Sequence, residues 1–415
     1  MQSSQTREIQ KRSIKILATV QVLSGVGTAG TVAAGSLLVA SISNSETLAG
    51  LAQTSSVLGA AAMAIPLSRL TQRGGRRLGL AIGYGFGALG ALIAISGGVQ
   101  RSLFLMLAGT FFVGAASASA LQARFAATDL ALPDSRSKQL SLVVWGSTVG
   151  AVAGPNLMGP SGAIAESFGL PRLVGPYLLA LSTLTLGALV IQVFLKPDPY
   201  LLASKFQHGA LTKPPLLPLR LSLQRIKSEP RSLFSIATIA VGHAVMISIM
   251  VMTPVHMAHV DVTIEVIGLV ISVHILGMYA FSPIVGWLSD RLGRVPLIQI
   301  GLAILLLSAI VSGLSPAGNA VMMGSGLFLL GLGWSCTLIA GSTLLTESVD
   351  SDFKSSAQGA SDLIMNLTGA IGGALAGVII GLLSYGWLCL ISTVPVFILA
   401  LASLSKKLSS PSHLQ

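Results

Sequence analysis

The decapeptide GWLSDRLGRV, at residues 286–295, places three charged side chains between two long apolar runs. The charged residues are Asp290, Arg291 and Arg294. They stand out because charged residues make up only 9% of the 415-residue chain, whereas hydrophobic residues make up 52%. A decapeptide this polar marks a short turn between two apolar segments, and similar turns are expected elsewhere in the chain.

The apolar segments on either side are long enough to cross a lipid bilayer, whose hydrocarbon core takes about 20 helical residues. Twelve such segments lie between polar stretches. Their approximate ranges are 15–40, 47–68, 78–99, 102–126, 139–160, 173–195, 232–255, 263–288, 296–315, 319–344, 356–382 and 386–404. A soluble domain could not cover that much apolar surface with so few charged residues. The sequence therefore predicts an all-α polytopic membrane protein with twelve transmembrane helices.

One long polar stretch, at 196–231, divides the twelve predicted helices into six and six. Its prolines and scattered basic residues suit a linker that lies on the membrane surface. We therefore expect an N-terminal six-helix bundle at 1–195, a linker at 196–231, and a C-terminal six-helix bundle with a short tail at 232–415.

Basic residues are unevenly distributed between the two sides of the predicted membrane. All but two of the 25 Lys and Arg residues fall on one side, the exceptions being Arg101 and Arg172. The positive-inside rule places the basic side, with both termini and the linker, in the cytoplasm. We expect the plasma membrane of a bacterial cell as the location. The net charge of +11 then reflects topology and anionic lipid rather than nucleic acid, for which no binding motif is present.

A related decapeptide, SRLTQRGGRR at 68–77, lies between the second and third predicted helices. An offset of 218 residues aligns the two decapeptides, so that Gly75 falls on Gly293 and Arg76 on Arg294. The same offset aligns Asp129 with Glu347, Asp134 with Asp352, Arg136 with Lys354, and Gly154 with Gly372. One offset that holds in separate regions indicates a duplicated six-helix unit, a plan typical of transporters.

The decapeptide at 286–295 is similar to the cytoplasmic loop signature of the major facilitator superfamily, in which a glycine precedes Asp-Arg-x-Gly-Arg. The matching residues are Gly286, Asp290, Arg291, Gly293 and Arg294. In the first-half copy, Ser68 replaces the glycine and Gln72 replaces the aspartate. The helix count, the central division and the basic linker extend the resemblance over the chain. It implies two pseudo-symmetric bundles that work by alternating access, with a substrate site near the bilayer midplane between them.

A second stretch, GAVAGPNLMG at 150–159, resembles the glycine-rich signature that marks antiporters of this family in the fifth helix. Gly150, Gly154, Pro155 and Gly159 match, whereas Met158 stands where the signature has another glycine. Thr110 occupies the position of the signature arginine in the fourth helix. The resemblance favours a drug:proton antiporter.

The loop charges are candidates for a gate. Asp290, near a helix end and beside Arg291 and Arg294, can form ion pairs that hold one conformation and break in another. The alternative is that the arginines only fix topology, which does not account for the aspartate. Further gating candidates lie in the first-half loop and at the end of the fourth helix, although in the first-half loop the topology interpretation is the favoured one. These candidates are Arg73, Gly75, Arg76, Arg124 and Asp129.

The energy for transport is expected to come from an ion gradient, because the sequence contains no GxxxxGK[ST] loop for ATP. Ionisable side chains inside a bilayer are costly and are therefore functional candidates. In order of preference, the candidates for proton coupling are His243, Asp362 and His274. Histidine titrates near neutral pH. Each histidine could instead be a structural residue that is hydrogen-bonded to a neighbouring helix.

The expected substrate cavity combines polar and adaptable side chains. Gln358, Asp362 and Asn366 are spaced by four residues and therefore share one helix face. Methionine adapts to varied apolar ligands, although ordinary packing is the alternative for a methionine stripe. The full expected lining is Gln21, Trp145, Asn156, Met246, Met250, Gln358 and Asn366.

Glycines four residues apart predict a close helix contact in each half. They are Gly146, Gly150 and Gly154 in the fifth helix, and Gly369, Gly373, Gly377 and Gly381 in the eleventh. Such a seam can slide during transport or pack statically, and its spacing does not distinguish these roles.

Together these features predict a secondary active transporter that couples export of a small, fairly apolar organic molecule to protons. Proton-coupled uptake of a nutrient or metabolite is the alternative, and a receptor or scaffold that transports nothing is a more distant one. We expect a monomer without enzymatic activity, cofactor or metal site. Its expected partners are the substrate, protons and the lipid bilayer.

Overall fold

The computed structural model of the chain describes residues 4–44, 48, 51–208, 219–258, 262, 264–316 and 318–405. The regular elements of this described part are helices, labelled α1 to α15 with short 3-10 turns between some of them, and it contains no strand. The predicted all-α fold is confirmed.

The chain divides into two compact units. Unit 1 comprises Met1–Leu132, Gly146–Leu217 and Ser351–Leu363, and unit 2 comprises Pro133–Trp145, Pro218–Asp350 and Ile364–Gln415. Two helices, α4 (Arg136–Asn156) and α14 (Ser351–Leu382), pass from one unit to the other. Each unit therefore combines most of one sequence half with the first turns of a helix from the other half. The expected functional division around the linker at 196–231 stays a prediction.

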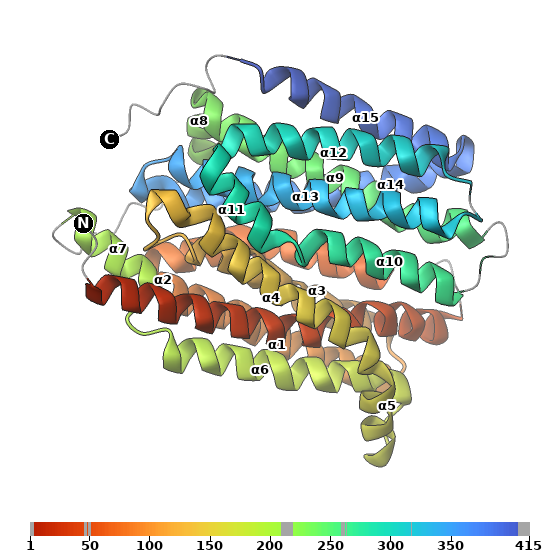
Figure 1. Cartoon of the computed structure of the whole chain (residues 1–415). Coiled ribbons are helices and arrows are strands. Elements are labelled where there is room, and N and C mark those ends of the chain that lie inside the picture. Colours follow the sequence, from red (N-terminus) through yellow and green to blue (C-terminus); the bar gives the residue numbers. More distant parts are fainter. Residues whose placement is uncertain are drawn as a thin grey trace. The chain divides into compact units, whose positions relative to one another are not determined.

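Unit 1 is built mainly from long helices that pack side by side (Figure 1). They are α1 (Ser4–Ser43), α2 (Leu51–Val99), α3 (Leu103–Ala126) and α6 (Gly175–Phe194), joined by α5 (Met158–Ser167), the 3-10 turn at Arg172–Val174, and α7 (Pro199–His208). Small residues bring α2 and α3 close together, since a Cβ on Gly90 would lie 2.5 Å from the backbone nitrogen of Val113.

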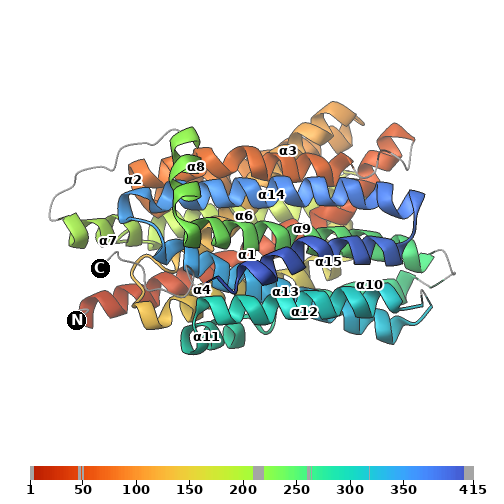
Figure 2. The same cartoon turned by 90° about the horizontal axis from the view of Figure 1, so that it is seen from above.

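Unit 2 has the corresponding set of helices in the second half of the sequence (Figure 2). They are α8 (Leu219–Ser228), α9 (Pro230–Ala258), α10 (Ile264–Tyr279), α11 (Ser282–Leu292), α12 (Arg294–Leu314), α13 (Ala320–Glu347) and α15 (Tyr385–Ala402). Helix α13 packs against α9, α10 and α12, and α15 packs against α9 and α12. The 3-10 turn at Pro133–Ser135, which precedes α4, also belongs to this unit.

The predicted helices at 47–68 and 78–99 both lie within α2, where non-helical backbone at Gly75, with φ at +85°, separates two helical stretches. Helix boundaries differ from the sequence prediction at three other places. The predicted helix at 139–160 is instead the pair α4 and α5, bent by 60°. The predicted helix at 263–288 is divided into α10 and α11, and the predicted linker contains the short helices α7 and α8.

Among the described residues, ten helices are long and apolar enough to cross a membrane, or eleven if the bent pair is one span. Because α2 alone covers two predicted spans, the count agrees with the twelve predicted segments. Many large apolar side chains lie on the outside, such as Phe104 at 79% exposure and Val321 at 81%. Such a surface is suited to lipid rather than to water.

Candidate functional site

An ion-pair cluster in unit 1 joins α2, the loop after α3, and α14. Arg76 is 1% exposed, and its Nε donates to Asp129 Oδ2 at 2.7 Å. Its Nη2 donates to Asp129 Oδ1 at 3.2 Å and to Gln358 Oε1 at 2.7 Å. Lys354 Nζ lies 3.6 Å from Asp129 Oδ1. We call Arg76, Asp129, Lys354 and Gln358 the first cluster.

An equivalent cluster in unit 2 joins α11, α12, the end of α13, and the start of α4. Arg294 donates to Glu347 from Nε at 3.2 Å and from Nη2 at 2.9 Å. Arg136 Nη1 lies 3.6 Å from Glu347 Oε1. Asp290 Oδ1 lies 3.0 Å from Arg294 Nη1. We call Asp290, Arg294, Glu347 and Arg136 the second cluster.

The two clusters are related by the sequence repeat. The offset of 218 residues converts Arg76 into Arg294, Asp129 into Glu347, and Lys354 into Arg136. Each cluster therefore holds an arginine, an acid that pairs with it, and one further base from the opposite sequence half; the second cluster also holds the acid Asp290. The repeat in the sequence aligns Glu347, Arg136 and Lys354 with other charged residues, but no role was predicted for them. The alignment itself was the signal that could have identified them.

The clusters differ where the loop signature differs. The Asp290 carboxylate accepts from the backbone N–H groups of Ser137 at 3.0 Å and Lys138 at 2.8 Å. These two N–H groups are unsatisfied within α4, because they belong to its first turn. A carboxylate at a helix N-terminus is also favoured by the helix dipole.

The first cluster has no such free backbone donors. Helix α14 begins at Ser351, so that the equivalent positions, 355 and 356, lie in its second turn and their N–H groups are used within the helix. Gln72 instead donates from Nε2 to the Ser356 hydroxyl at 2.5 Å. Gln72 therefore departs from the signature aspartate at a place where its partner, the Ser356 hydroxyl of α14, accepts a hydrogen bond.

The signature glycine, Gly286, packs against a serine, and the equivalent contact in unit 1 has the glycine and the serine at each other's positions. In unit 2, a Cβ on Gly286 would lie 2.6 Å from the Cβ of Ser141, so the pair has room for only one side chain. In unit 1, a Cβ on Gly359 would lie 2.6 Å from the Cβ of Ser68. The offset of 218 converts Ser68 into Gly286 and Ser141 into Gly359. Each contact thus contains one glycine and one serine, in opposite order.

The other loop residues that were predicted to act as a gate are not members of either ion-pair cluster. Gly75, at φ +85°, and Gly293, at φ +97°, occupy backbone conformations that favour glycine. At Gly75 the Asp198 carboxylate accepts from the backbone N–H of Arg77 at 2.7 Å, which satisfies a donor after the break in α2. Arg73 is exposed, and Arg291 lies over the Trp287 ring at 5.2 Å. Arg73 and Arg291 therefore lie outside the ion-pair clusters.

Arg124 and Asp362 form a further ion pair inside unit 1. Arg124 Nη2 donates to Asp362 Oδ1 at 2.7 Å, and both side chains are at most 2% exposed. Arg124 also lies over the Phe125 ring at 4.4 Å. The sequence predicted a gating role for Arg124 and proton coupling for Asp362. The structure brings the two together as one buried pair between α3 and α14.

The two predicted proton-coupling histidines have different environments. His243 is partly buried near the middle of α9, and its Nδ1 accepts from Trp334 Nε1 of α13 at 3.2 Å. His274 is fully buried in α10, with Nδ1 2.8 Å from the Leu327 carbonyl oxygen. A histidine held by a backbone carbonyl between two packed helices is suited to a structural role.

The predicted substrate-cavity residues are scattered over both units. In unit 1, Gln21 is buried and donates to the Ala120 carbonyl at 3.1 Å, whereas the exposed Asn156 bonds to the Val152 carbonyl of its own helix at 2.7 Å. In unit 2, Met246 and Asn366 are buried, Met250 is partly buried, and Trp145 is 43% exposed. Gln358 belongs to the first cluster. The cavity assignment stays a prediction.

The glycine seam of the fifth helix faces α1. A Cβ on Gly25 would lie 2.9 Å from the Cα of Gly150, and one on Gly154 would lie 2.5 Å from the Cβ of Ala29. Beyond the bend, a Cβ on Gly159 would meet no other atom within 4 Å.

The glycine seam of α14 is in contact over its first part. Gly369 packs on His243 and Gly373 on Ile247, whereas a Cβ on Gly377 or Gly381 would meet no other atom within 4 Å. The close contact therefore extends over only part of each predicted seam. Pro155 lies at the end of α4.

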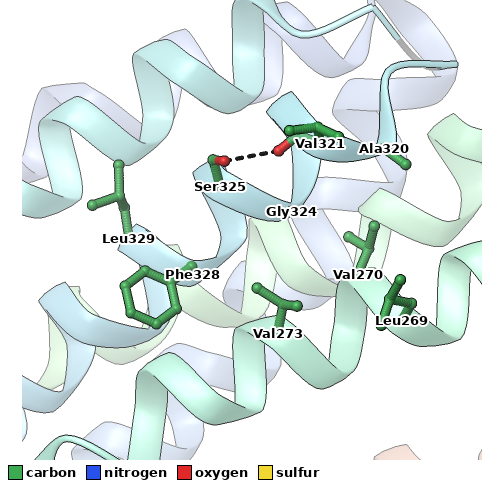
Figure 3. Close-up of a pocket in the computed structure, with 9 residues that line it drawn as sticks. All are labelled: Leu269, Val270, Val273, Ala320, Val321, Gly324, Ser325, Phe328 and Leu329. Atoms are coloured by element: carbon green, nitrogen blue, oxygen red, sulfur yellow. Dashed lines mark hydrogen bonds between the residues drawn. The ribbon is translucent and has the colours of Figure 1, made fainter.

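An apolar groove of about 510 Å³ lies between α10 and α13 (Figure 3). Its walls are aliphatic and aromatic, with Ser325 as the polar residue, and the Ser325 hydroxyl donates to the Val321 carbonyl at 2.8 Å. Leu269 and Val321 at its edge are 63% and 81% exposed. The groove contains none of the predicted cavity residues and opens onto the apolar outer surface.

The family is shown by comparison with known proteins. The family model described as Major Facilitator Superfamily matches residues 17–263 and 234–413. Together with the all-helical fold, this match defines a multi-pass membrane transporter. The chain belongs to the Major Facilitator Superfamily.

Among its relatives, the chain is 36% identical to the uncharacterized MFS-type transporter YdeG of Bacillus subtilis over 386 residues, which is 93% of this chain and 89% of that protein. It is 28% identical to the riboflavin transporter RfnT of Brucella anthropi, over 91% of this chain and 90% of that protein.

Solved structures show the same fold at lower sequence identity. The E. coli fucose:proton symporter FucP has a TM-score of 0.70 at 16% identity, covering 95% of this chain and 98% of that one. The human organic anion transporter MFSD10 has a TM-score of 0.74 at 15% identity, covering 95% and 99%.

Proposed function

We propose that this transporter is secondary active and exports a small, fairly apolar organic molecule in exchange for protons, by alternating access. The observation that carries the proton-coupled part is His243, an ionisable side chain near the middle of an apolar helix. An ionisable group at that depth is costly unless it has a function. His243 ranks before Asp362, which is paired with Arg124, and before His274, which is bonded to a carbonyl. The direction rests on the antiporter-like motif at 150–159.

The two ion-pair clusters are proposed as latches that hold one conformation of the transport cycle. Each connects helices from both sequence halves, so that it must open if those helices separate. Asp290 adds a carboxylate on the first turn of α4, which supports its proposed role as a gate rather than a topology marker alone. The pair of Arg76 and Asp129, at 1% exposure each, is screened less by water than an exposed ion pair.

A second candidate is proton-coupled transport of a more polar heteroaromatic nutrient. It is favoured by the 28% identity to the riboflavin transporter RfnT along 91% of the chain. Riboflavin therefore belongs in any substrate panel, beside apolar cations and apolar neutral compounds.

The test is transport by purified protein in proteoliposomes under an imposed pH gradient. We expect gradient-driven movement of at least one compound, with loss of this movement in His243→Gln and retention of substrate exchange without a gradient. Glutamine keeps hydrogen-bonding capacity but does not titrate. Full pH-driven accumulation in both His243→Gln and Asp362→Asn would contradict proton coupling at these residues. Accumulation of the substrate in the direction opposite to proton flow distinguishes antiport from symport.

The topology is proposed from the distribution of basic residues, with both termini and position 208 in the cytoplasm of a bacterial cell. A cysteine replacing His208, in a background without Cys336 and Cys389, should react with a membrane-impermeant maleimide only after permeabilisation. A cysteine replacing Arg101 in the same background is the matched control and should react in intact cells. Labelling of position 208 in intact cells would reverse the proposed orientation.

A further inference from the structure

The hydrogen bond between Trp334 and His243 fixes the protonation state of the imidazole. An indole N–H can only donate. His243 Nδ1, 3.2 Å from Trp334 Nε1, must therefore carry a lone pair, and the single proton of the neutral ring lies on Nε2. A protonated ring would present a second N–H to the indole N–H, and the bond would be lost.

Both members of the pair are held by packing against neighbouring helices. Trp334 is 3% exposed, and Tyr279 of α10 packs edge-on against it, with ring centroids 5.7 Å apart and an interplanar angle of 87°. On the other side of the imidazole, a Cβ on Gly369 would lie 2.7 Å from His243 Cδ2 and 3.0 Å from Nε2. The ring of His243 therefore fits because position 369 has no side chain.

The repeat shows that this pair belongs to the second half alone. The offset of 218 converts His243 into Gly25 and Trp334 into Ala116. Gly25 packs directly on Gly150 of α4, without a side chain between them. The second half thus carries an imidazole where the first half has a glycine in contact with α4, and an indole where the first half has Ala116.

Several titratable groups on the helices that pack against α9 have contacts of their own. His274 is bonded to the Leu327 carbonyl, Tyr385 to Thr253, and Arg294 to Glu347, while Arg225 and Lys227 of α8 are exposed. The described part of α14 beyond residue 363 carries no titratable side chain. Tyr279 stands next to the pair, and a phenol stays neutral over the range in which histidine titrates.

We propose that Trp334 is the positioning residue for the proton-binding atom of His243. Its indole N–H covers Nδ1 while the imidazole is neutral, and the indole must move before Nδ1 can take up a proton. The proton enters at Nδ1 from water and leaves from the same atom, after which the bond to Trp334 re-forms. The inference rests on the proposed proton coupling at His243, and it adds the atom that is loaded and the group that must move.

The fluorescence of Trp334 tests this directly. With Trp145, Trp287 and Trp387 replaced by phenylalanine, the emission of Trp334 in the purified protein should change in one transition between about pH 5 and pH 8. The transition should be lost in the same protein carrying His243→Gln, because glutamine accepts from the indole but does not titrate. A matched protein that retains Trp387 alone, 53% exposed on α15, should show no transition. A flat emission from Trp334, or a transition that survives His243→Gln, would overturn the proposal.

A second variant keeps the other tryptophans in place. Trp334→Phe should remain a transporter with an altered pH profile, since the neutral imidazole loses one hydrogen bond. An unchanged pH profile would overturn the positioning role. If proton-driven transport depends on His243 while the Trp334 emission is flat, only this inference fails. If the emission titrates with His243 and no proton-driven transport is found, the proposed function fails instead.

Discussion

Replacing Arg124 by glutamine is expected to destabilise the purified protein by about 3–5 kcal/mol, because it leaves the Asp362 carboxylate buried without its cation. Both side chains are at most 2% exposed, so water cannot take the place of the guanidinium. The measurement is the thermal unfolding midpoint in detergent. Arg73→Gln, which removes an exposed arginine from α2, is the matched control and should change the midpoint little.

The double variant Arg124→Gln/Asp362→Asn separates the loss of the ion pair from the cost of leaving one charge buried without its partner. Removing both charges should recover most of the lost stability, since two neutral amides of similar size can bond to each other. A double variant as unstable as Arg124→Gln alone would show that the guanidinium stabilises the fold through other contacts. The same double variant in proteoliposomes reports whether the pair also contributes to transport.

Introducing a serine at Gly286 is expected to disrupt the close contact between α11 and α4 beside the second cluster. Its Cβ would lie 2.6 Å from the Cβ of Ser141 and 2.6 Å from the Ser137 carbonyl oxygen. Such overpacking costs typically about 1–3 kcal/mol, which corresponds to roughly a five- to 150-fold change in a conformational equilibrium. We expect α4 and α11 to move apart. Spin labels at the exposed positions 138 and 291 should therefore show longer distances.

The reciprocal exchange supplies the control. Gly286→Ser/Ser141→Gly recreates the order of residues found at Ser68 and Gly359, and should restore part of the short distance. Recovery is expected to be incomplete because the Ser137 carbonyl remains close. Distances unchanged by Gly286→Ser would contradict the close contact. Asp290→Asn, which keeps the local volume but removes the charge at the first turn of α4, distinguishes the electrostatic contribution from the steric one.

Much of the candidate site could be predicted from the sequence because the repeat is preserved in it. Residues such as Arg76, Asp129 and Arg294 were identified by charge in an apolar chain and by a constant offset. Their partners were not identified, because Lys354 and Arg136 reach the acids from the opposite sequence half. Trp334 carried no signal, since a tryptophan within an apolar helix is expected to pack against its neighbours or lipid.

The sequence by itself determined the class of protein and the number of apolar segments. It did so because segment length is fixed by bilayer thickness, and because charges are excluded from the hydrocarbon core. Only the tertiary structure decided that Asp362 pairs with Arg124 and that His243 faces Trp334. It also decided that Asp290 meets free backbone donors, whereas Gln72 meets a hydroxyl. These contacts depend on where each helix begins, how far α4 and α5 bend, and how each helix is rotated about its axis. None of these is encoded in the spacing of apolar residues along an almost uniformly apolar helix.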